Sequence, residues 1–314
     1  MTRTKRSCKQ IFTQGINWFL VALLSIALAL TACSPTEQTP TRYVFDDLGR
    51  LVAINGTPQR IISLAPSNTE ILFALGLGDK VVGVTDYCNY PPEAQEKEKV
   101  MGYSTPNIEK IIALNPDLIL AGYGNPINVV YTLEGLGLPV FGIKTTDLDD
   151  LLDDIRRIGE ITDKAIEAQV ITAEMAVKIQ AVTNQTEELE ESPKVFYLFD
   201  TYGGLWTVGQ GTFIHELIEK GGGVNICQNL TGYTTIGIEE VIARNPEIII
   251  TGSYPGVYEW AMNETALNVT DARQNDRVYT CNDDLAQRPG PRIFKGLEWF
   301  AYFIHPEIFE EPEG

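Results

Sequence analysis

The chain has 314 residues, and its 42 acidic and 24 basic side chains give a formal net charge of −18. Nucleic acids and anionic lipid surfaces carry charge of the same sign, so the composition argues against both as binding partners. The length is enough for two lobes, each near the usual domain size of about 100–150 residues.

Residues 1–32 have the pattern of a secretory signal peptide. Four basic residues precede an uncharged stretch at residues 18–30, and the small residues Thr31 and Ala32 then lead to Cys33. Such an ending is typical of a lipobox, whose cysteine carries the lipid of a lipoprotein. An uncleaved membrane anchor is the alternative, although the uncharged stretch is shorter than the ~20 residues that a spanning helix needs.

Cleavage before Cys33 would leave a protein tethered outside the cytoplasmic membrane. Residues 33–42 are predicted to be the lipidated cysteine and its tether, because this segment is rich in Ser, Pro, Thr and Gln. The mature chain would hold 20 basic and 42 acidic residues, a net charge of −22. We therefore expect an extracytoplasmic protein, lipid-anchored to the cell membrane on its periplasmic side or at the cell surface.

Residues 43–147 are predicted to form an N-terminal lobe. A hairpin at residues 43–54 comes first, and apolar strands then alternate with helices. The strands are expected at residues 60–64, 81–84, 118–121 and 140–143, and the helices at residues 70–75, 108–114 and 129–136. Alternation of this kind indicates a parallel sheet with helices on both faces.

Residues 148–190 are predicted to form a helix that links two lobes. Up to about Leu189 they contain no proline and one glycine, and aliphatic residues recur at helical spacing. A long helix, broken at most once, would act as a stiff strut and would permit only a small closure of the lobes. The alternative is two ordinary helices inside one domain.

Residues 191–314 are predicted to form a C-terminal lobe of the same α/β kind. Its strands are expected at residues 194–199, 248–251 and 277–280, and its helices include residues 213–219 and 293–303. Glycines in this region, such as Gly203 and Gly221, are interpreted as turns and a helix end rather than as a nucleotide cradle.

One segment occurs in both predicted lobes. Residues 107–120 recur 130 positions later as residues 237–250, each as an amphipathic helix that ends at Asn-Pro and is followed by an apolar strand. This separation is too long for a solenoid repeat of about 20–50 residues, so two equivalent lobes are the simpler interpretation. Glu109 and Glu239 hold matching positions in the two copies.

Cysteines and histidines give no strong sign of metal binding. Besides Cys8 and Cys33, the chain has three cysteines: Cys88, Cys227 and Cys281. No two of them have the short spacing of metal ligands. The sequence leaves buried free thiols and one disulfide as equal alternatives. The two histidines, His215 and His305, are too few for a multi-histidine metal site and are expected to be structural. A tyrosinate ligand to iron stays open.

An enzyme is not expected. The chain lacks a Gly-x-Ser-x-Gly elbow, a Gly-x-x-x-x-Gly-Lys phosphate loop and a Cys and His pair at a known catalytic spacing. An extracytoplasmic enzyme with a scattered active site, or a sensor with the same two-lobed architecture, remains the alternative of another class.

Several segments together resemble a known family. They run from Arg60 to Leu72 (RIISLAPSNTEIL), and on through VGVTDYCNYPP at residues 82–92, NIE at 107–109, NPDLI at 115–119 and GGGVNI at 221–226. In this order they resemble the substrate-binding lipoproteins of ABC importers, in the branch of cobalamin, ferric-siderophore and haem binders, over roughly residues 43–305. The resemblance implies two doubly wound α/β lobes with parallel sheets, joined by one long backbone helix, with a ligand cleft between the lobes.

The resemblance also implies a docking role for the repeated glutamates. In that family a glutamate on each lobe contacts arginines of the membrane permease, and the matching residues here are Glu109 and Glu239. Two carboxylates on matched surfaces would fix orientation and assist encounter. The alternative for each is a first-turn glutamate favoured by the helix dipole. Glu70, in another helix-opening segment, is interpreted as a cap.

Ligand-binding residues are expected where strands end, at the edge at which doubly wound sheets bind ligands. The candidates are Tyr87, Tyr103, Tyr123, Tyr202, Trp206, Tyr233 and Arg288. Aligned with the cobalamin binder, Tyr87 matches a cleft tyrosine, and Tyr103 and Tyr233 match cleft tryptophans, whereas Gly122 stands where that protein has a further tryptophan. Aromatic rings on both lobes could enclose a flat chelate, and each ring alone could be ordinary loop packing.

The sequence thus predicts a non-enzymatic importer component that binds a corrinoid, with a ferric siderophore or haem as the alternative ligand. No cofactor is expected other than this metal chelate as cargo. The expected partners are an ABC permease with its ATPase subunits and the membrane reached through the lipid, and the protein itself is expected to be a monomer.

Overall fold

The computed structural model describes residues 40–102, 104–122 and 124–313. The signal peptide, Cys33 and the tether up to residue 39, and the candidates Tyr103 and Tyr123, lie outside these residues. From Thr41 onward the chain forms one compact unit.

The first lobe is built on a five-stranded parallel sheet with the order β5-β4-β3-β6-β7. Its strands are β3 (Ile61–Ser63), β4 (Val81–Val84), β5 (Glu98–Lys99), β6 (Leu118–Ala121) and β7 (Val140–Gly142). From β3 the chain adds strands first on one side and then on the other, so the order reverses between β3 and β6. The predicted parallel sheet is confirmed.

The second lobe is built on a four-stranded parallel sheet with the order β10-β8-β12-β13. Its strands are β8 (Lys194–Leu198), β10 (Val224–Asn225), β12 (Ile248–Thr251) and β13 (Val278–Thr280). Here the strand order reverses between β8 and β12. Buried aliphatic residues fill these strands, as expected for sheets covered on both faces.

Two antiparallel pairs accompany the sheets. The predicted N-terminal hairpin pairs β1 (Thr41–Phe45) with β2 (Leu51–Asn55). In the second lobe β9 (Leu205–Val208) pairs with β11 (Tyr233–Ile236), a ribbon that the sequence analysis did not predict.

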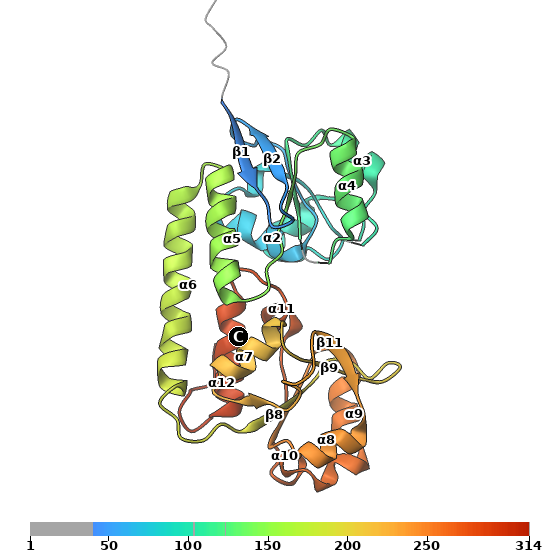
Figure 1. Ribbon diagram of the computed structural model, residues 1–314, viewed down its shortest axis with the longest axis vertical. Coiled ribbons are helices and arrows are strands. Elements are labelled where there is room, and N and C mark those ends of the chain that lie inside the picture. Colours follow the sequence, from blue (N-terminus) through green and yellow to red (C-terminus); the bar gives the residue numbers. More distant parts are fainter. Residues whose placement is uncertain (1–39, 103, 123, 314) are drawn as a thin grey trace, which may run out of the picture. The chain divides into compact units, whose positions relative to one another are not determined.

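Helices cover the sheets of both lobes (Figure 1). Those of the first lobe are α2 (Pro66–Ala74), α3 (Ile108–Ala113) and α4 (Ile127–Gly135), with 3₁₀ turns at Gly78–Lys80 and Pro92–Glu96. Those of the second lobe are α7 (Phe213–Lys220), α8 (Ile238–Arg244), α9 (Val257–Asn263), α10 (Asp271–Gln274), α11 (Asp283–Ala286) and α12 (Ile293–Ile304), with a 3₁₀ turn at Thr265–Val269.

The linking segment is broken once. It consists of α5 (Leu148–Ile161) and α6 (Ala165–Thr186), which turn back on each other, so a single uninterrupted helix over residues 148–190 does not form. Asp163 adopts φ of 58°, and the Lys164 N–H donates to the Gly159 carbonyl at 2.7 Å, the hydrogen bond of a Schellman C-cap. A Cβ on Gly159 would lie 2.4 Å from the Ala168 side chain, so this glycine lets the two helices approach closely.

Helix α6 alone provides the long connection. It packs beside α5 in its first part and beside α12 and α7 of the second lobe in its second part (Figure 1). One shared core runs through this region, since buried side chains of α5, α6 and α12 belong to the same cluster as those of β3 and β8.

The repeated segment has the same structure in both lobes. Asn115 and Asn245 follow α3 and α8 with φ of 45° and 46°, a left-handed turn that asparagine tolerates. Asp117 accepts a hydrogen bond from the Arg60 N–H at the start of β3, and its repeat partner Glu247 accepts one from the Lys194 N–H at the start of β8. The two repeated segments are therefore equivalent in their turn and in this side-chain contact.

Candidate functional site

The reversal of strand order marks the expected binding edge in each lobe. In open α/β sheets ligands bind beyond the carboxyl ends of the strands at such a reversal. In the first lobe this place follows β3 and β6, and in the second it follows β8 and β12. The residues found there are mostly aromatic in the second lobe and small or amide-bearing in the first.

Three aromatic rings meet at the binding edge of the second lobe. Phe199 directly follows β8, and its ring lies edge-on to Tyr233 at 5.4 Å and to Tyr254 at 5.3 Å between centroids. Tyr233 is 38% exposed and Tyr254 50% exposed, so both offer ring surface to a ligand. The predicted Tyr233 is thus placed in an aromatic group with Phe199, which directly follows β8, and Tyr254, three residues after β12, and the sequence analysis missed both.

Two further predicted residues lie beside this group. Trp206 on β9 and Tyr233 on β11 share one face of the ribbon, because Tyr233 pairs with Val208, two residues from Trp206. The Trp206 indole N–H donates to the Tyr202 carbonyl at 3.1 Å, and this bond holds the exposed turn that carries Tyr202. Tyr202 is 88% exposed, which fits a residue that gains its contacts only with a ligand.

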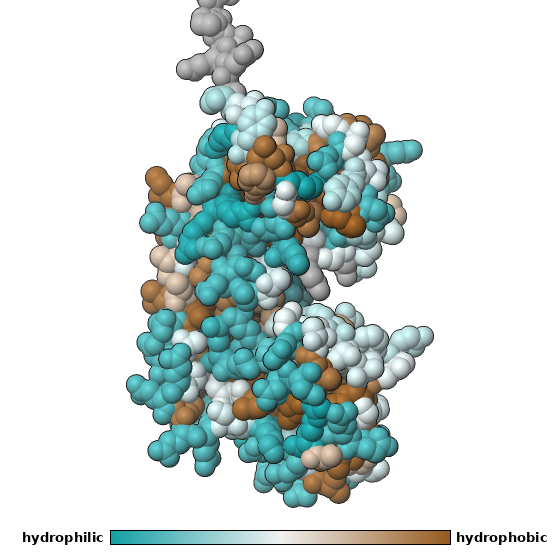
Figure 2. Space-filling view, viewed as in Figure 1, coloured by the Kyte–Doolittle hydropathy of each residue, from teal (hydrophilic) through white to brown (hydrophobic). Residues whose placement is uncertain are grey.

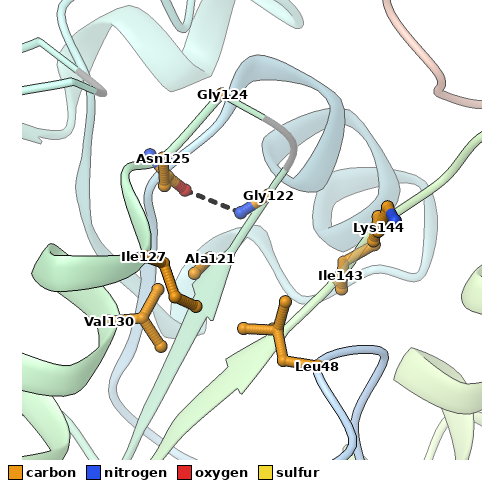
Figure 3. Close-up of a pocket in the computed structure, with 10 residues that line it drawn as sticks. Leu48, Ala121, Gly122, Gly124, Asn125, Ile127, Val130, Ile143 and Lys144 are labelled. Carbon is orange, nitrogen blue, oxygen red and sulfur yellow. Dashed lines mark hydrogen bonds between the residues drawn. The ribbon is translucent and has the colours of Figure 1, made fainter.

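The first lobe presents a pocket of about 220 Å³ at the carboxyl ends of β6 and β7. Figure 3 shows the aliphatic side chains of Leu48, Ile127 and Val130 around it and Lys144 at its rim. Gly122 and Asn125 form its other side, where the Gly122 N–H donates to Asn125 Oδ1 at 2.6 Å. The pocket suits an apolar group of a ligand with a polar or anionic atom near the lysine.

Gly122 leaves no room for a side chain in the present packing. A Cβ there would lie 2.8 Å from the Ala65 Cβ and 3.2 Å from the Asn68 amide nitrogen. That nitrogen is buried and has no hydrogen-bond partner among the described residues. A tryptophan at this position would therefore require the start of α2 to move, so the first-lobe wall differs physically from one that carries a tryptophan there.

Tyr87 follows β4 on the same edge and is 57% exposed. Its position agrees with a role on the first-lobe wall.

Arg288 lies at a contact between the two lobes. Its guanidinium donates to Asn89 Oδ1 of the first lobe at 2.6 Å and pairs with Asp284 of its own lobe at 2.6 Å. Only 17% of its side chain is exposed. Arg288 is therefore placed where both lobes meet, and a ligand would have to share or replace these partners to reach it.

A second contact between the lobes is a nearly buried ion pair. Both carboxylate oxygens of Glu70, on α2, accept from Arg292, at the start of α12, at 2.8 and 2.6 Å. The Tyr90 ring lies against the Arg292 guanidinium at 3.7 Å. The expected cap role of Glu70 is wrong, because the side chain, 2% exposed, points at Arg292 instead of at the helix N–H groups.

These contacts show which edges of the lobes face each other. Glu70 and Asn89 follow strands of the first sheet, and Arg288 and Arg292 follow β13 of the second, so carboxyl edges meet at the contact. Figure 2 shows the surface hollowed between the lobes. A groove of about 400 Å³ beside the ion pair is lined by Phe73, Tyr90 and Pro291 among others.

Glu109 and Glu239 occupy the second position of α3 and α8, and both are exposed. Within the described part of the chain neither carboxylate forms an ion pair, so both charges are available at the surface. Their helices start differently: Asn107 accepts a hydrogen bond from the Lys110 N–H, whereas Gly237 provides no side-chain cap.

Cysteines and histidines are structural in this fold. Cys88, Cys227 and Cys281 are free and buried, and burial raises the pKa of the Cys227 and Cys281 thiols, which makes both poor nucleophiles. His215 lies 3.3 Å from the Asn225 amide and His305 lies 3.2 Å from the Gly222 carbonyl. Among residues 40–102, 104–122 and 124–313, no three His, Cys, Asp or Glu side chains gather as a metal site.

Two equivalent doubly wound lobes with aromatic and amide groups at facing carboxyl edges define a binding protein of the two-lobed type. The family model described as periplasmic binding protein matches residues 61–285, and the chain belongs to this family. The family consists of binding proteins rather than enzymes, which confirms the prediction that this protein has no catalytic role.

Relatives place the chain more closely. It is 31% identical over 308 residues to YvrC of Bacillus subtilis, an uncharacterized ABC transporter substrate-binding lipoprotein, covering 92% of this chain and 97% of that protein. The crystal structure of the periplasmic vitamin B12-binding protein BtuF of Vibrio cholerae matches with a TM-score of 0.72 and 33% identity, over 79% of this chain and 97% of the other. A possible iron-binding periplasmic protein of Staphylococcus epidermidis matches with a TM-score of 0.71 and 30% identity, over 79% and 99%.

These findings confirm the predicted fold class and the role as an extracytoplasmic substrate-binding protein of an ABC importer. Among the helices of the described residues, none is both long and apolar enough to cross a membrane.

Proposed function

We propose that the protein captures a corrinoid and delivers it to the permease of its ABC importer. The observation that carries the proposal is the aromatic group of Phe199, Tyr233 and Tyr254 at the binding edge of the second lobe. Exposed ring faces there suit a large flat ligand, which the smaller first-lobe side chains can accommodate on its other face. The likeness to BtuF over nearly all of that protein supports a corrinoid over other chelates.

Calorimetric titration of the fragment that starts at Thr41 tests the ligand. The titrants are cyanocobalamin, dicyanocobinamide, a hydroxamate and a catecholate ferric siderophore, and haemin. We expect tight one-to-one binding of the corrinoids. Tyr233→Ala should weaken it about fivefold, because an aromatic contact contributes about 1 kcal/mol beyond its area. Tyr43→Ala, an equally conservative change at an exposed ring on the β1–β2 hairpin, is the matched control and should bind like the wild type.

A ferric chelate is the second candidate ligand. Besides Trp206, the aromatic candidates at the binding edges are tyrosines, and a tyrosinate can bind iron. The Staphylococcus epidermidis protein, described as a possible iron-binding protein, matches at similar identity and supports this alternative. Heat from a ferric siderophore or haemin with no heat from either corrinoid would establish this alternative. Absence of binding by all five compounds would contradict both ligands.

We further propose that Cys33 carries a lipid that anchors the protein to the membrane. The lipobox-like sequence before it and the lipoprotein relative support this assignment. Metabolic labelling with a fatty acid should mark the wild-type protein and not Cys33→Ala, which should also leave the membrane fraction.

A further inference from the structure

Helix α6 is apolar on two opposite faces. Its inner face, with Ala168, Thr172, Met175 and Val182, is buried against the rest of the protein. Its outer face exposes Ile166 to 78%, Val170 to 52% and Val177 to 69%. Exposed apolar side chains gathered on one face of a helix mark an interaction surface, so the outer face is suited to a partner.

The outer residues follow the spacing of a coiled-coil seam. The α6 seam consists of residues separated by four, three, four, three and four positions: Ile166, Val170, Ala173, Val177, Gln180 and Asn184. With Val170, Val177 and Asn184 at heptad position a, the remaining three fall at position d. The seam is about 27 Å long at 1.5 Å per residue, and none of its six residues is charged. Figure 2 shows apolar atoms along the edge that α6 forms in Figure 1.

A second copy of this chain fits the seam better than an unrelated protein surface would. Each mature copy would have a net charge of −22, so two copies repel each other except where an uncharged surface is presented. The seam supplies such a surface, and a twofold dimer requires a patch complementary to itself. Small Ala173 at the centre permits close approach of two helix backbones.

The seam residues favour a parallel pair. β-Branched residues and a single asparagine at position a are the signature of parallel two-stranded coiled coils, and Val170, Val177 and Asn184 hold these positions. In a parallel pair the flanking Glu174 faces the partner's Gln169, whereas an antiparallel pair would bring Glu174 close to its own symmetry mate. Charge therefore disfavours the antiparallel arrangement.

The start of the described chain lies at the start of α6. Arg42 donates to the carbonyls of Glu160 and Ile161 at the end of α5 and pairs with Asp163 in the turn that precedes α6. Copies tethered through their N-terminal segments to one membrane would thus hold the same end of α6 toward it. This common orientation is the one that a parallel pair requires.

We propose that two copies of this protein associate in parallel through the α6 seam. This inference replaces the expected monomer and is independent of the ligand. Two seams of six side chains each bury less surface than the 1,200–2,000 Å² of a stable interface. The dimer is therefore weak in dilute solution. Confinement to a membrane raises the effective concentration and with it the dimer fraction.

Cysteine crosslinking in the full-length protein tests the arrangement. In a parallel pair the two copies of position 177 face each other within disulfide distance, so Val177→Cys should form a disulfide-linked dimer when membranes are mildly oxidised. The native cysteines of the described chain are buried, so the unmodified protein sets a low background. Gln185→Cys, an exposed position on α6 outside the seam, is the matched control and should crosslink at least fivefold less.

Other outcomes would overturn the proposal. Crosslinks only in mixtures of Ala173→Cys with Val177→Cys would mean an antiparallel pair, because an a position then faces a d position of the partner helix. Equal crosslinking at positions 177 and 185 would mean random collision. Adding Val170→Glu to Val177→Cys should abolish the crosslink while leaving the melting temperature unchanged, because residue 170 is exposed. A persistent crosslink in that double variant would also contradict the seam.

Discussion

At the scale of single residues, Glu70 is a carboxylate held almost out of water by two arginines, closely by Arg292 and at 3.6 Å by Arg288. Its side chain is 2% exposed, and Arg292 binds both of its oxygens from a position 222 residues later in the chain. A buried charge is tolerated only when it is paired and hydrogen-bonded. The pair therefore fixes the contact between the lobes more than it adds net stability.

We predict that Glu70→Gln destabilises the protein by about 3 kcal/mol. The neutral amide leaves the Arg292 guanidinium without its counter-charge in a largely buried place, and breaking such a pair is more costly than replacing it. Urea unfolding at neutral pH measures the change.

The double variant Glu70→Leu with Arg292→Met is the control for this pair. Removing both charges and keeping the volume should restore most of the lost stability. If Glu70→Gln unfolds at the same urea concentration as the wild type, the ion pair does not form in solution.

Asp154 is a second buried carboxylate, on α5, but it lacks a close cationic partner. Thr145 Oγ1 donates to it at 2.8 Å, and Arg157 is 3.5 Å away and shared with Asp47. Burial raises the pKa of Asp154 to about 7, the Thr145 hydrogen bond opposes the shift, and the charge of Asp47 adds to it.

We predict that Asp154→Asn removes a pH dependence of stability. Between about pH 4 and 7 the folded protein keeps the Asp154 proton that the unfolded chain has released, so the free energy of unfolding of the wild type falls as pH rises through this range. Asparagine can still accept from Thr145 and carries no charge. The variant should match the wild type near pH 4.5 and exceed it at pH 8 by on the order of 2 kcal/mol.

Urea unfolding at pH 4.5, 6 and 8 measures this difference. A gap between variant and wild type that stays constant over the three pH values would mean that Asp154 is already ionised in the folded protein at pH 4.5.

At the scale of elements, local sequence signals predicted most strands and helices, and distant contacts decided the rest. Continuous apolar runs located β3, β6, β8 and β12, and the Asn-Pro turns located the ends of α3 and α8. The break between α5 and α6 depends on Gly159 and Asp163, which resemble ordinary helix residues until the packing of Ala168 is known. The β9–β11 ribbon depends on pairing between strands separated by about 25 residues.

The candidate site was predictable to a similar degree. Position after an apolar strand was enough to find Tyr87, and the same signal applied to Tyr254, three residues after β12, would have found it. Tyr233 is the first residue of β11 and was found by its match to a cleft tryptophan, whereas Phe199 was assigned to the strand itself. The roles of Glu70 and Arg288 were not predictable, because their partners come from the other lobe and no local pattern specifies them.

The two repeated helix ends allow a matched stability test. Asn115 and Asn245 share the left-handed conformation, but only Asn245 has side-chain hydrogen bonds among the described residues, donating to Asp271 Oδ2 at 2.7 Å and accepting from the Asp271 N–H at 3.0 Å. Glycine tolerates this backbone conformation equally well. We predict that Asn245→Gly costs about 1–2 kcal/mol through the two lost hydrogen bonds, whereas Asn115→Gly changes stability by less than about 0.5 kcal/mol.

Thermal or urea unfolding of the two variants side by side measures this difference. Equal losses would attribute the cost to the glycine backbone rather than to the Asp271 contact.

At the scale of the whole molecule, the repeat places one matching exposed glutamate on each lobe. Glu109 and Glu239 lie at the same position of equivalent helices, and each is exposed, so the protein presents one carboxylate per lobe in equivalent settings. A helix-dipole role would explain each glutamate alone but gives no reason for the match. We propose instead that the pair contacts two basic groups of the permease.

We predict that Glu109→Gln combined with Glu239→Gln abolishes import without weakening ligand capture. Each carboxylate forms no ion pair within the described chain, so the folded protein and its binding edge should be unaffected, whereas the charge contact with the permease is lost on both sides. Uptake of labelled ligand by cells and calorimetric affinity of the purified protein are measured in parallel.

The matched control is Glu240→Gln, which neutralises a second exposed glutamate beside Glu239. It removes only the ion pair with Arg244 within α8 and should leave uptake near the wild-type rate. Each single docking variant should retain intermediate uptake, since one charge contact still orients its lobe. Uptake at the wild-type rate in the double variant would exclude the docking role, and an equal fall in uptake and affinity would place the two residues in ligand binding instead.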